Sequence, residues 1–136
     1  MPAGEELLDT HMVSLIESPL YHVDGQILDE VFVYGSFVQS KMHQRGVVCS
    51  NCHNPHSLEL KAPGNQVCGQ CHNPTRFDGP QHHHHASTSA GAECANCHMP
   101  ETTYMVVDPR RDHRLKIPRP DLSAELGVPN ACNQCH

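Results

Sequence analysis

The cysteines of the chain stand in four short units of one spacing, and a histidine ends every unit. The units are CSNCH at 49–53, CGQCH at 68–72, CANCH at 94–98 and CNQCH at 132–136. No cysteine lies outside them. A pair of thiols separated by two residues and followed directly by an imidazole is the attachment signal for a c-type haem.

The residue types of each unit explain this chemistry. The two thiols form thioether bonds with the two vinyl groups of one haem, and the histidine binds the iron on the proximal side. Four units therefore predict four covalent haem c groups, each with one iron. The expected thioether residues are Cys49, Cys52, Cys68, Cys71, Cys94, Cys97, Cys132 and Cys135. The expected proximal ligands are His53, His72, His98 and His136.

Three other uses of paired cysteines explain less of the pattern. Two all-cysteine zinc sites would use the thiols but give no role to the histidines. A thioredoxin-like redox site needs a βαβ context, which this sequence lacks. A disulfide framework leaves the histidines equally unexplained. Haem attachment is the interpretation that uses every residue of the four units.

Large apolar side chains are too scarce for an ordinary hydrophobic core. The 136 residues include three Phe, three Tyr and no Trp. We therefore expect one domain over residues 1–136, with the haems as its core. Its fold class is expected to be mostly coil with short α-helices and little or no β-sheet. Because the apolar planes and their ligands organise the chain together, we expect no folding without haem.

Hydrophobic periodicity predicts an N-terminal helical arm over residues 1–46. Within it, residues 5–16 place apolar side chains on one face, which predicts an amphipathic helix that ends before Pro19. A second helix is predicted over residues 30–45, with Asp29 as a possible N-cap and Gly46 as its end.

The haem-binding region is expected to span residues 47–136. Short helices are predicted on each C-x-x-C-H unit and over residues 121–127. Segments 73–93 and 106–120 are punctuated by Pro and Gly, so we expect them to be irregular.

The formal net charge of −6 is unevenly distributed along the chain. Acidic residues dominate the first thirty positions, whereas a basic run comes late and consists of Arg110, Arg111, Arg114, Lys116 and Arg119. We expect this run to be a solvated face or a set of partners for haem propionates. An acidic whole without interleaved aromatic residues predicts no nucleic-acid partner. No segment is long and apolar enough to predict a membrane span.

The N-terminal residues bear on localisation. Thioether attachment takes place outside the cytoplasm, so we expect a periplasmic or extracellular protein. An export signal has a basic n-region followed by an apolar h-region, and MPAGEELLDT has neither. We therefore expect the sequence to be a mature chain, a truncated chain or a fragment of a longer one.

Three phrases between the cysteine units carry a family resemblance. YHVDGQILDEVFVYGSFVQSKMHQRGVVCSNCHNPHS, AGAECANCHMPETTYMVVDPRRDH and IPRPDLS resemble the tetrahaem block of secreted multihaem cytochromes c, some of which carry tetratricopeptide repeats. GVVCSNCHNPH is similar, more distantly, to the cytochrome c nitrite reductase and hydroxylamine oxidoreductase superfamily. The resemblance covers most of residues 19–136.

A low-spin haem iron needs a sixth ligand, and nine further histidines could supply one. They are His11, His22, His43, His56, His82, His83, His84, His85 and His113. The resemblance implies that His22, His56, His113 and one member of the 82–85 run are distal ligands, with His82 and His85 favoured. We expect His11 and His43 to be solvent-exposed or hydrogen-bonded. Methionines at 42, 99 and 105 are expected to pack rather than to bind iron.

These expectations lead to an electron carrier. Four closely spaced haems with two histidine ligands each would have fairly low reduction potentials. No side chain needs to act as acid, base or nucleophile, so we do not expect an enzyme. The expected partners are redox proteins or an extracellular electron acceptor.

Two alternatives stay open. One is the haem module of an oxidoreductase that acts on a small nitrogen or sulfur compound at one open iron. The other concerns assembly: the haem of His136 lies where the polypeptide runs out, so an uncovered edge there predicts head-to-tail association into a cytochrome filament.

Overall fold

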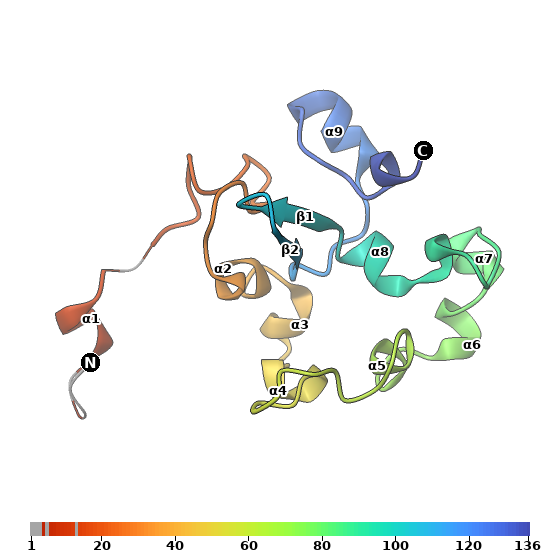
Figure 1. The fold of residues 1–136 in the computed structure, drawn as a ribbon, viewed down its shortest axis with the longest axis horizontal. Coiled ribbons are helices and arrows are strands. Elements are labelled where there is room, and N and C mark those ends of the chain that lie inside the picture. Colours follow the sequence, from red (N-terminus) through yellow and green to blue (C-terminus); the bar gives the residue numbers. More distant parts are fainter. Residues whose placement is uncertain (1–3, 5, 13) are drawn as a thin grey trace.

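The computed structural model describes residues 4, 6–12 and 14–136. Short helices, joined by coil, follow one another around an arc, and one small hairpin lies inside it (Figure 1). This confirms the expected fold class of coil with short helices and little sheet. None of the helices within these residues has the length and apolar character needed to cross a bilayer.

Each cysteine unit forms or overlaps about one helical turn. The elements are α4 (Cys49–Cys52), α5 (Gln66–Gly69), α8 (Cys94–His98) and the 3₁₀ helix η2 (Cys132–Gln134). In three units the histidine N–H donates to the carbonyl of the first cysteine, at 2.9 Å for His53 and 3.0 Å for His72 and His136. One turn therefore suffices to fix the thiols relative to the imidazole, and the prediction of short helices on the units is confirmed.

The first predicted helix is much shorter in the structure. Only α1 (Leu7–Thr10) forms, and residues 5 and 13 of the predicted range lie outside the described residues. Met12, Leu15 and Ile16 are 98%, 61% and 46% exposed. An apolar face without a surface to pack against gives a short helix little stability, because isolated helices of fewer than about 12 residues are marginal in water. The prediction of a helix over residues 5–16 was wrong in extent.

The second predicted helix is divided in two. It forms α2 (Val33–Phe37) and α3 (Lys41–Gln44). Buried Ser40 begins α3 as an N-cap, because its hydroxyl accepts a hydrogen bond from His43 N–H at 3.0 Å. Gly35 lies inside α2 because a Cβ there would be 2.1 Å from the Tyr21 hydroxyl.

A β-hairpin occupies part of a segment predicted to be irregular. Strands β1 (Glu101–Tyr104) and β2 (Asp108–Arg111) pair antiparallel, with Glu101 opposite Arg111 and Tyr104 opposite Asp108. Met105 and Val106 in the turn have φ of 50° and 73°. Hairpin turns with positive φ usually carry Asn or Gly, so these two residues carry no turn signal.

The segment 73–93 is also more regular than predicted. It holds α6 (Pro74–Phe77), α7 (Pro80–His83) and η1 (Ala90–Ala92). Proline begins both α6 and α7, where its missing N–H costs no helical hydrogen bond. Near the C-terminus, α9 (Pro120–Leu126) ends at Gly127 with φ 70°, as the sequence predicted.

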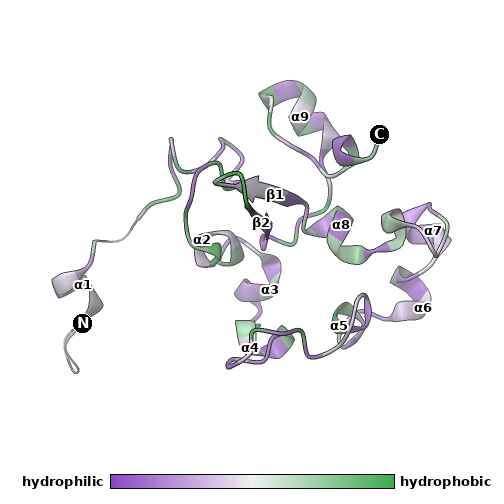
Figure 2. Ribbon diagram, viewed as in Figure 1, coloured by the Kyte–Doolittle hydropathy of each residue, from purple (hydrophilic) through white to green (hydrophobic). Residues whose placement is uncertain are grey.

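Few apolar side chains are buried. Among the described residues they are Tyr21, Phe37, Ala92, Val128 and Ala131. Hydrophobic and hydrophilic residues are interspersed along most of the ribbon (Figure 2). Polypeptide packing alone therefore provides a very small core, which agrees with the scarcity of aromatic residues.

A buried polar cluster connects the N-terminal segment to the C-terminal third. Arg114, 5% exposed, donates from Nε to Asp112 Oδ2 at 2.8 Å and from Nη1 to the Asp24 carbonyl at 2.7 Å. The Ser36 hydroxyl donates to Asp112 at 2.7 Å, and the Gln26 amide donates to the Pro129 carbonyl at 2.8 Å. We call these residues, Asp24, Gln26, Ser36, Asp112 and Arg114, the Arg114 cluster.

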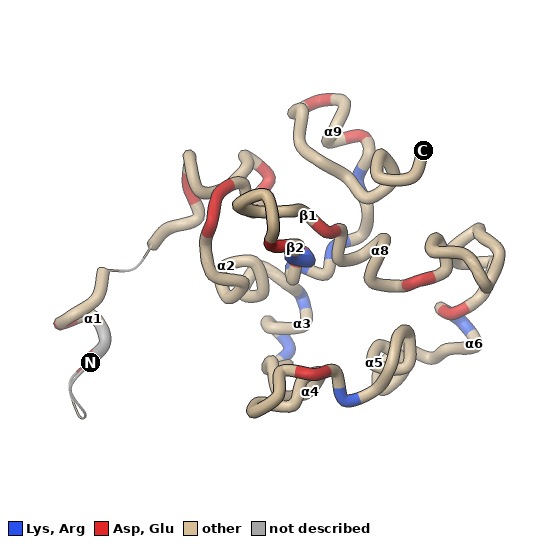
Figure 3. Tube along the Cα trace, in the orientation of Figure 1, with Lys and Arg blue, Asp and Glu red and all other residues tan. Residues whose placement is uncertain are grey.

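Other members of the basic run also meet acidic residues. Arg110 pairs with Asp108 at 2.6 Å and Glu30 at 3.3 Å, and Arg119 pairs with Asp121. The acidic stretch just before α2 accordingly lies near β2 (Figure 3), and Glu30 of this stretch pairs with Arg110. Much of the late positive charge is therefore used in internal ion pairs.

Candidate haem-binding sites

Thiols of successive cysteine units lie close together. Burial raises the pKa of Cys52, and the nearby Cys71 thiol of the next unit raises it further. Burial likewise raises the pKa of Cys94 to about 11, and Cys94 is hydrogen-bonded to Cys68 of the preceding unit.

The third and fourth units are neighbours in the same way. Burial raises the pKa of Cys97, and the proximity of Cys132 and Cys135 adds to the shift. The four units thus follow one another in space in the order of the sequence. Among the described residues, the cysteines are free thiols that are exposed or half-buried.

Four histidines have one ring nitrogen held by a backbone carbonyl. The Nδ1 atoms of His53, His98 and His113 lie 2.8, 2.9 and 2.8 Å from the carbonyls of Leu58, Lys116 and Arg111. His85 Nδ1 is held by the carbonyl of His83. A carbonyl only accepts, so Nδ1 carries the proton and the lone pair of Nε2 is left for a metal.

Three of these carbonyl groups, those of Leu58, His83 and Lys116, belong to or directly adjoin a residue with a left-handed backbone conformation. Leu58, His84 and Leu115 have φ of 62°, 59° and 51°. Positive φ is unfavourable for a residue such as leucine, and such conformations concentrate at functional sites. The loops that aim the carbonyls at the imidazoles are therefore locally strained.

Three of the predicted proximal imidazoles face a second imidazole. The ring centres of His53 and His113 are 6.4 Å apart, those of His98 and His82 are 6.1 Å apart, and those of His136 and His85 are 5.8 Å apart. A metal between two imidazoles has bonds of about 2 Å on each side, and each nitrogen lies about 1 Å from its ring centre, so the centres lie roughly 6 Å apart. Two imidazoles in direct face-to-face contact would have their ring centres closer together than this.

These separations and the Nδ1 contacts fit a bis-histidine iron. A bis-histidine c-type haem would need two free thiols beside its proximal histidine and a second imidazole as the other iron ligand. The described His, Cys, Asp and Glu residues form no cluster of three or more with the geometry of a metal site. Paired imidazoles are what the structure presents instead.

His72 has a different neighbour. Its ring meets Phe77 edge-on, with centres 5.8 Å apart, and Phe77 in turn meets His82 at 5.4 Å. Among the ring contacts of the described residues, none brings a second imidazole to His72. Phe77 is a residue that the sequence interpretation missed, because a lone Phe in a loop rich in Pro and Gly carries no signal.

The other two predicted distal histidines, His56 and His22, have no imidazole against them within the described part of the chain. His56 is exposed in the loop after α4, where its N–H donates to Asn54 Oδ1 at 2.9 Å. His22 is half-buried and lines an open hollow of about 690 Å³. Apolar residues around this hollow include Ile16, Leu28, Leu126 and Val128.

Histidines that were not favoured as ligands behave differently. His43 packs edge-on against Phe37, with ring centres 5.5 Å apart, and His11 is exposed. The Nδ1 atom of His83 accepts a hydrogen bond from the His85 N–H at 3.2 Å. The sequence interpretation favoured His82 and His85 among the 82–85 run, and these are the two members that lie beside proximal imidazoles.

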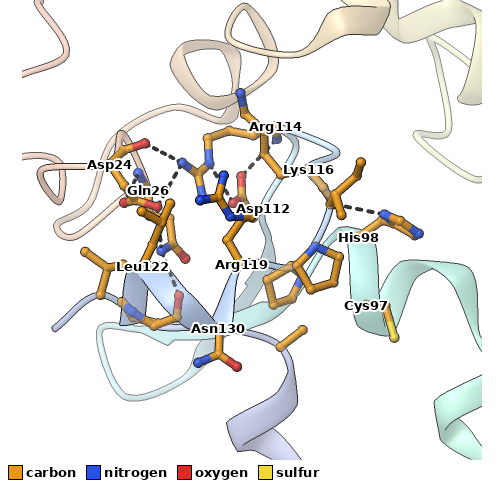
Figure 4. Close-up of a pocket in the computed structure, with 16 residues that line it drawn as sticks. Asp24, Gln26, Cys97, His98, Asp112, Arg114, Lys116, Arg119, Leu122 and Asn130 are labelled. Atoms are coloured by element: carbon orange, nitrogen blue, oxygen red, sulfur yellow. Dashed lines mark hydrogen bonds and ion pairs between the residues drawn. The ribbon is translucent and has the colours of Figure 1, made fainter. Parts of the chain in front are cut away.

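A cavity of about 200 Å³ lies beside the third cysteine unit (Figure 4). Its lining includes Cys97, His98, Lys116 and Arg119, together with every member of the Arg114 cluster except Ser36. Arg114 and Arg119 already pair with Asp24, Asp112 and Asp121. Lys116 is exposed and lines the same cavity, so its charge would be available to neutralise a haem propionate there.

Comparison with known proteins identifies the family. The model for cytochrome c7 and related cytochrome c matches residues 54–136, which is more than half of the chain. The match includes three of the cysteine units and begins directly after His53, the last residue of the first unit. No curated protein and no solved structure matches the chain. The chain belongs to the family of cytochrome c7 and related cytochromes c, and it is a multihaem c-type cytochrome that carries electrons between redox partners on iron-containing haem c.

Proposed function

We propose that this cytochrome carries four haems c, one on each cysteine unit, as the tetrahaem block of secreted multihaem cytochromes does. The observation that carries the proposal is the set of three imidazole pairs with ring centres 5.8–6.4 Å apart. Each pair joins a proximal histidine to a histidine outside the cysteine units. Haem supplies one-electron chemistry, because its iron cycles between the ferric and ferrous states.

The ligand pairs follow from these contacts. We assign His53 with His113, His98 with His82, and His136 with His85 as axial pairs. For His72 we assign His56, because the loop that carries His56 follows the first unit, and Cys52 of that unit lies near Cys71 of the second. His22 is then a further imidazole beyond the eight that four haems require.

Electrons are proposed to pass between haems in the order of the cysteine units. The hydrogen bond between Cys68 and Cys94 supports this order, as does the electrostatic effect of Cys71 on Cys52 and of Cys132 on Cys97. Residues 82–85 supply ligands to the third and fourth haems, so one short segment holds both. We propose that residues 1–136 act as one domain, because the Arg114 cluster ties the arm (1–46) to the haem-binding region (47–136).

The first test is stoichiometry. Four covalent haems add roughly 2.5 kDa to the chain mass, since each C-x-x-C-H unit takes one haem. Intact-mass spectrometry of the matured protein is expected to show this increment. The first cysteine unit lies outside the segment matched by the family model. A fully matured protein with only three haems would therefore indicate that this unit binds no haem.

We further propose a periplasmic or extracellular location, where thioether attachment takes place. Proteins of this family are typically periplasmic. The expected partners are redox proteins or an extracellular electron acceptor. Fractionation of cells that express the full-length protein, with peroxidase staining of covalent haem, checks the location; staining confined to the cytoplasm would contradict it.

A filament is the proposed form of assembly. His22 lies in an open hollow with apolar walls, and His136 is exposed at the other end of the chain. Two different surfaces that meet head-to-tail generate an open chain of subunits rather than a closed dimer. Negative-stain microscopy over a concentration series is expected to show fibres. Uniformly small particles with the sedimentation mass of one protomer would contradict the filament, but they would remain consistent with a tetrahaem electron carrier.

A catalytic role at one iron is the second candidate, and the contact between His72 and Phe77 is the observation that favours it. If an imidazole does not bind opposite His72, that iron is open to a small nitrogen or sulfur compound. Absorption and electron paramagnetic resonance (EPR) spectra of the oxidised protein separate the two functions. A carrier with four bis-histidine haems is expected to be fully low-spin, whereas an open iron gives a high-spin fraction.

A further inference from the structure

Phe77 stands between histidines that belong to two different haem sites. It is the last residue of α6, and it is half-buried. Its ring centre lies 5.8 Å from that of His72 and 5.4 Å from that of His82, and both contacts are close to perpendicular, with interplanar angles of 88°. His72 belongs to the second cysteine unit, and His82 faces His98 of the third.

Neighbouring groups hold Phe77 in this place. The Arg76 guanidinium lies over its ring, 5.0 Å from the centre, which is a favourable cation–π distance. Asn73 caps α6 by accepting a hydrogen bond from Thr75 N–H at 3.0 Å. At the other end of α6, the Asp78 carboxylate accepts from the Asn65 amide at 2.8 Å. The ring is thus fixed from both ends of its helix.

Perpendicular aromatic contacts restrict how an imidazole can rotate about its bond to the rest of the side chain. The ring of Phe77 also occupies space between the two imidazoles, because it contacts both of them. Around a metal site, the apolar shell controls solvent access and dielectric, and through them the reduction potential. Water near a haem stabilises the more highly charged ferric form and lowers its potential.

We propose that Phe77 is a positioning residue shared by the second and third haems. It fixes the orientation of His72 and His82 and keeps water away from both. This inference rests on the ligand roles proposed above for these two histidines. Haems one and four, whose paired histidines have no ring contact with Phe77 among the described residues, are outside its influence.

The experiment compares holoprotein variants at Phe77 with a variant of an exposed phenylalanine. Phe77→Ala removes the ring, Phe77→Leu keeps most of the volume without the flat ring, and Phe77→Tyr keeps the ring. Phe32→Ala is the matched control, because Phe32 is 90% exposed. Intact mass counts the haems, a potentiometric titration gives their potentials, and the EPR spectrum reports the orientation of axial imidazoles.

Phe77→Ala is expected to keep four haems, to shift two of the four potentials downward and to change two of the low-spin EPR signals. Phe77→Tyr is expected to restore wild-type values, and Phe32→Ala to leave them unchanged. Wild-type potentials and signals in Phe77→Ala would overturn the proposal. If that variant loses haem, Phe77→Leu decides: altered signals support the role of the ring, and wild-type signals overturn it.

Failure of the ligand assignment itself looks different. In that case the wild-type protein would carry fewer than four haems or would lack bis-histidine low-spin signals. A wild-type protein with four low-spin haems and a silent Phe77→Ala variant would contradict only the role of Phe77.

Discussion

At the scale of single residues, the imidazoles are arranged by their backbone partners. His53, His98 and His113 each have Nδ1 fixed by a carbonyl at 2.8–2.9 Å, so their Nε2 atoms have a defined direction before any metal binds. Such contacts also increase the basicity of a ligand and so tune the metal. Axial ligation can therefore be tested one histidine at a time.

His113→Met is expected to raise the potential of one haem and to leave four haems attached. Methionine ligation raises haem potentials, and the shift is expected to be on the order of 0.1 V, a fraction of the roughly 0.8 V that axial ligands span. A redox titration measures it. His43→Met is the control, because His43 packs against Phe37 instead. A titration of His113→Met that matches wild type would remove His113 from the ligand set.

The Arg114 cluster gives a second prediction at this scale. Arg114→Met leaves the carboxylates of Asp24 and Asp112 largely buried without their cation. Removal of one partner from a buried ion pair costs about 3–5 kcal/mol. We therefore expect the holoprotein to unfold at a much lower concentration of guanidinium chloride. Circular dichroism measures the midpoint of this unfolding transition.

Arg119→Met is the matched control for this variant. Arg119 pairs with Asp121 on the surface, where both side chains are more than half exposed, and exposed ion pairs contribute little to stability. Its midpoint is expected to stay close to that of wild type. Equal changes in the unfolding midpoint for the two substitutions would show that burial of the Arg114 cluster does not add to the stability of the protein.

At the scale of elements, the helices are too short to stabilise one another by packing, and side-chain hydrogen bonds join them instead. Asn65 is the best example. Its amide donates to Asp78 at 2.8 Å and to the Ala92 carbonyl at 2.9 Å, and its oxygen accepts from Cys94 N–H at 2.9 Å. One side chain therefore connects α5, the end of α6 and the start of α8.

Asn65→Ala is expected to destabilise the holoprotein by about 1–3 kcal/mol, because it leaves buried or half-buried polar groups without partners. It should also loosen the spacing of the second and third cysteine units and broaden the EPR signals of their haems. Asn96→Ala, which removes a single bond to the Ala90 carbonyl, is the control. A midpoint for Asn65→Ala no lower than that of Asn96→Ala would contradict this role.

At the scale of the whole molecule, the polypeptide has almost no core of its own. Tyr21, Phe37, Ala92, Val128 and Ala131 are the buried apolar residues among those described, and large side chains such as Leu58, Leu60 and Val48 are exposed near the cysteine units. We expect the haems to cover these side chains, in which case the fold and the electron-carrying function depend on the same groups.

We accordingly expect the chain to remain unfolded when all eight cysteines are replaced by serine. Without thioether attachment, neither the apolar planes nor the iron bonds are available to offset the loss of chain entropy. Far-ultraviolet circular dichroism and the dispersion of amide signals in NMR spectra measure this. Native-like dispersion in the serine variant would show that the polypeptide packs without haem.

The sequence by itself determined the class of cofactor and the class of fold. A C-x-x-C-H unit is chemically complete within five adjacent residues, and one helical turn is enough to shape it, so no distant contact is needed to recognise it. The family match and the short helices on the units agree with that local interpretation. The small core could also be predicted from the sequence, because the number of large aromatic side chains is known without any tertiary contact.

Only the tertiary structure decided which elements persist and which imidazoles meet. The helix over residues 5–16 shortened because its apolar face has nothing to pack against, and the hairpin formed without a turn signal because pairing of β1 with β2 outweighs the strain at Met105 and Val106. His113 reaches His53, and Phe77 reaches both His72 and His82, across loops. Contacts of this kind depend on the path of the backbone between them, which no local pattern of residues encodes.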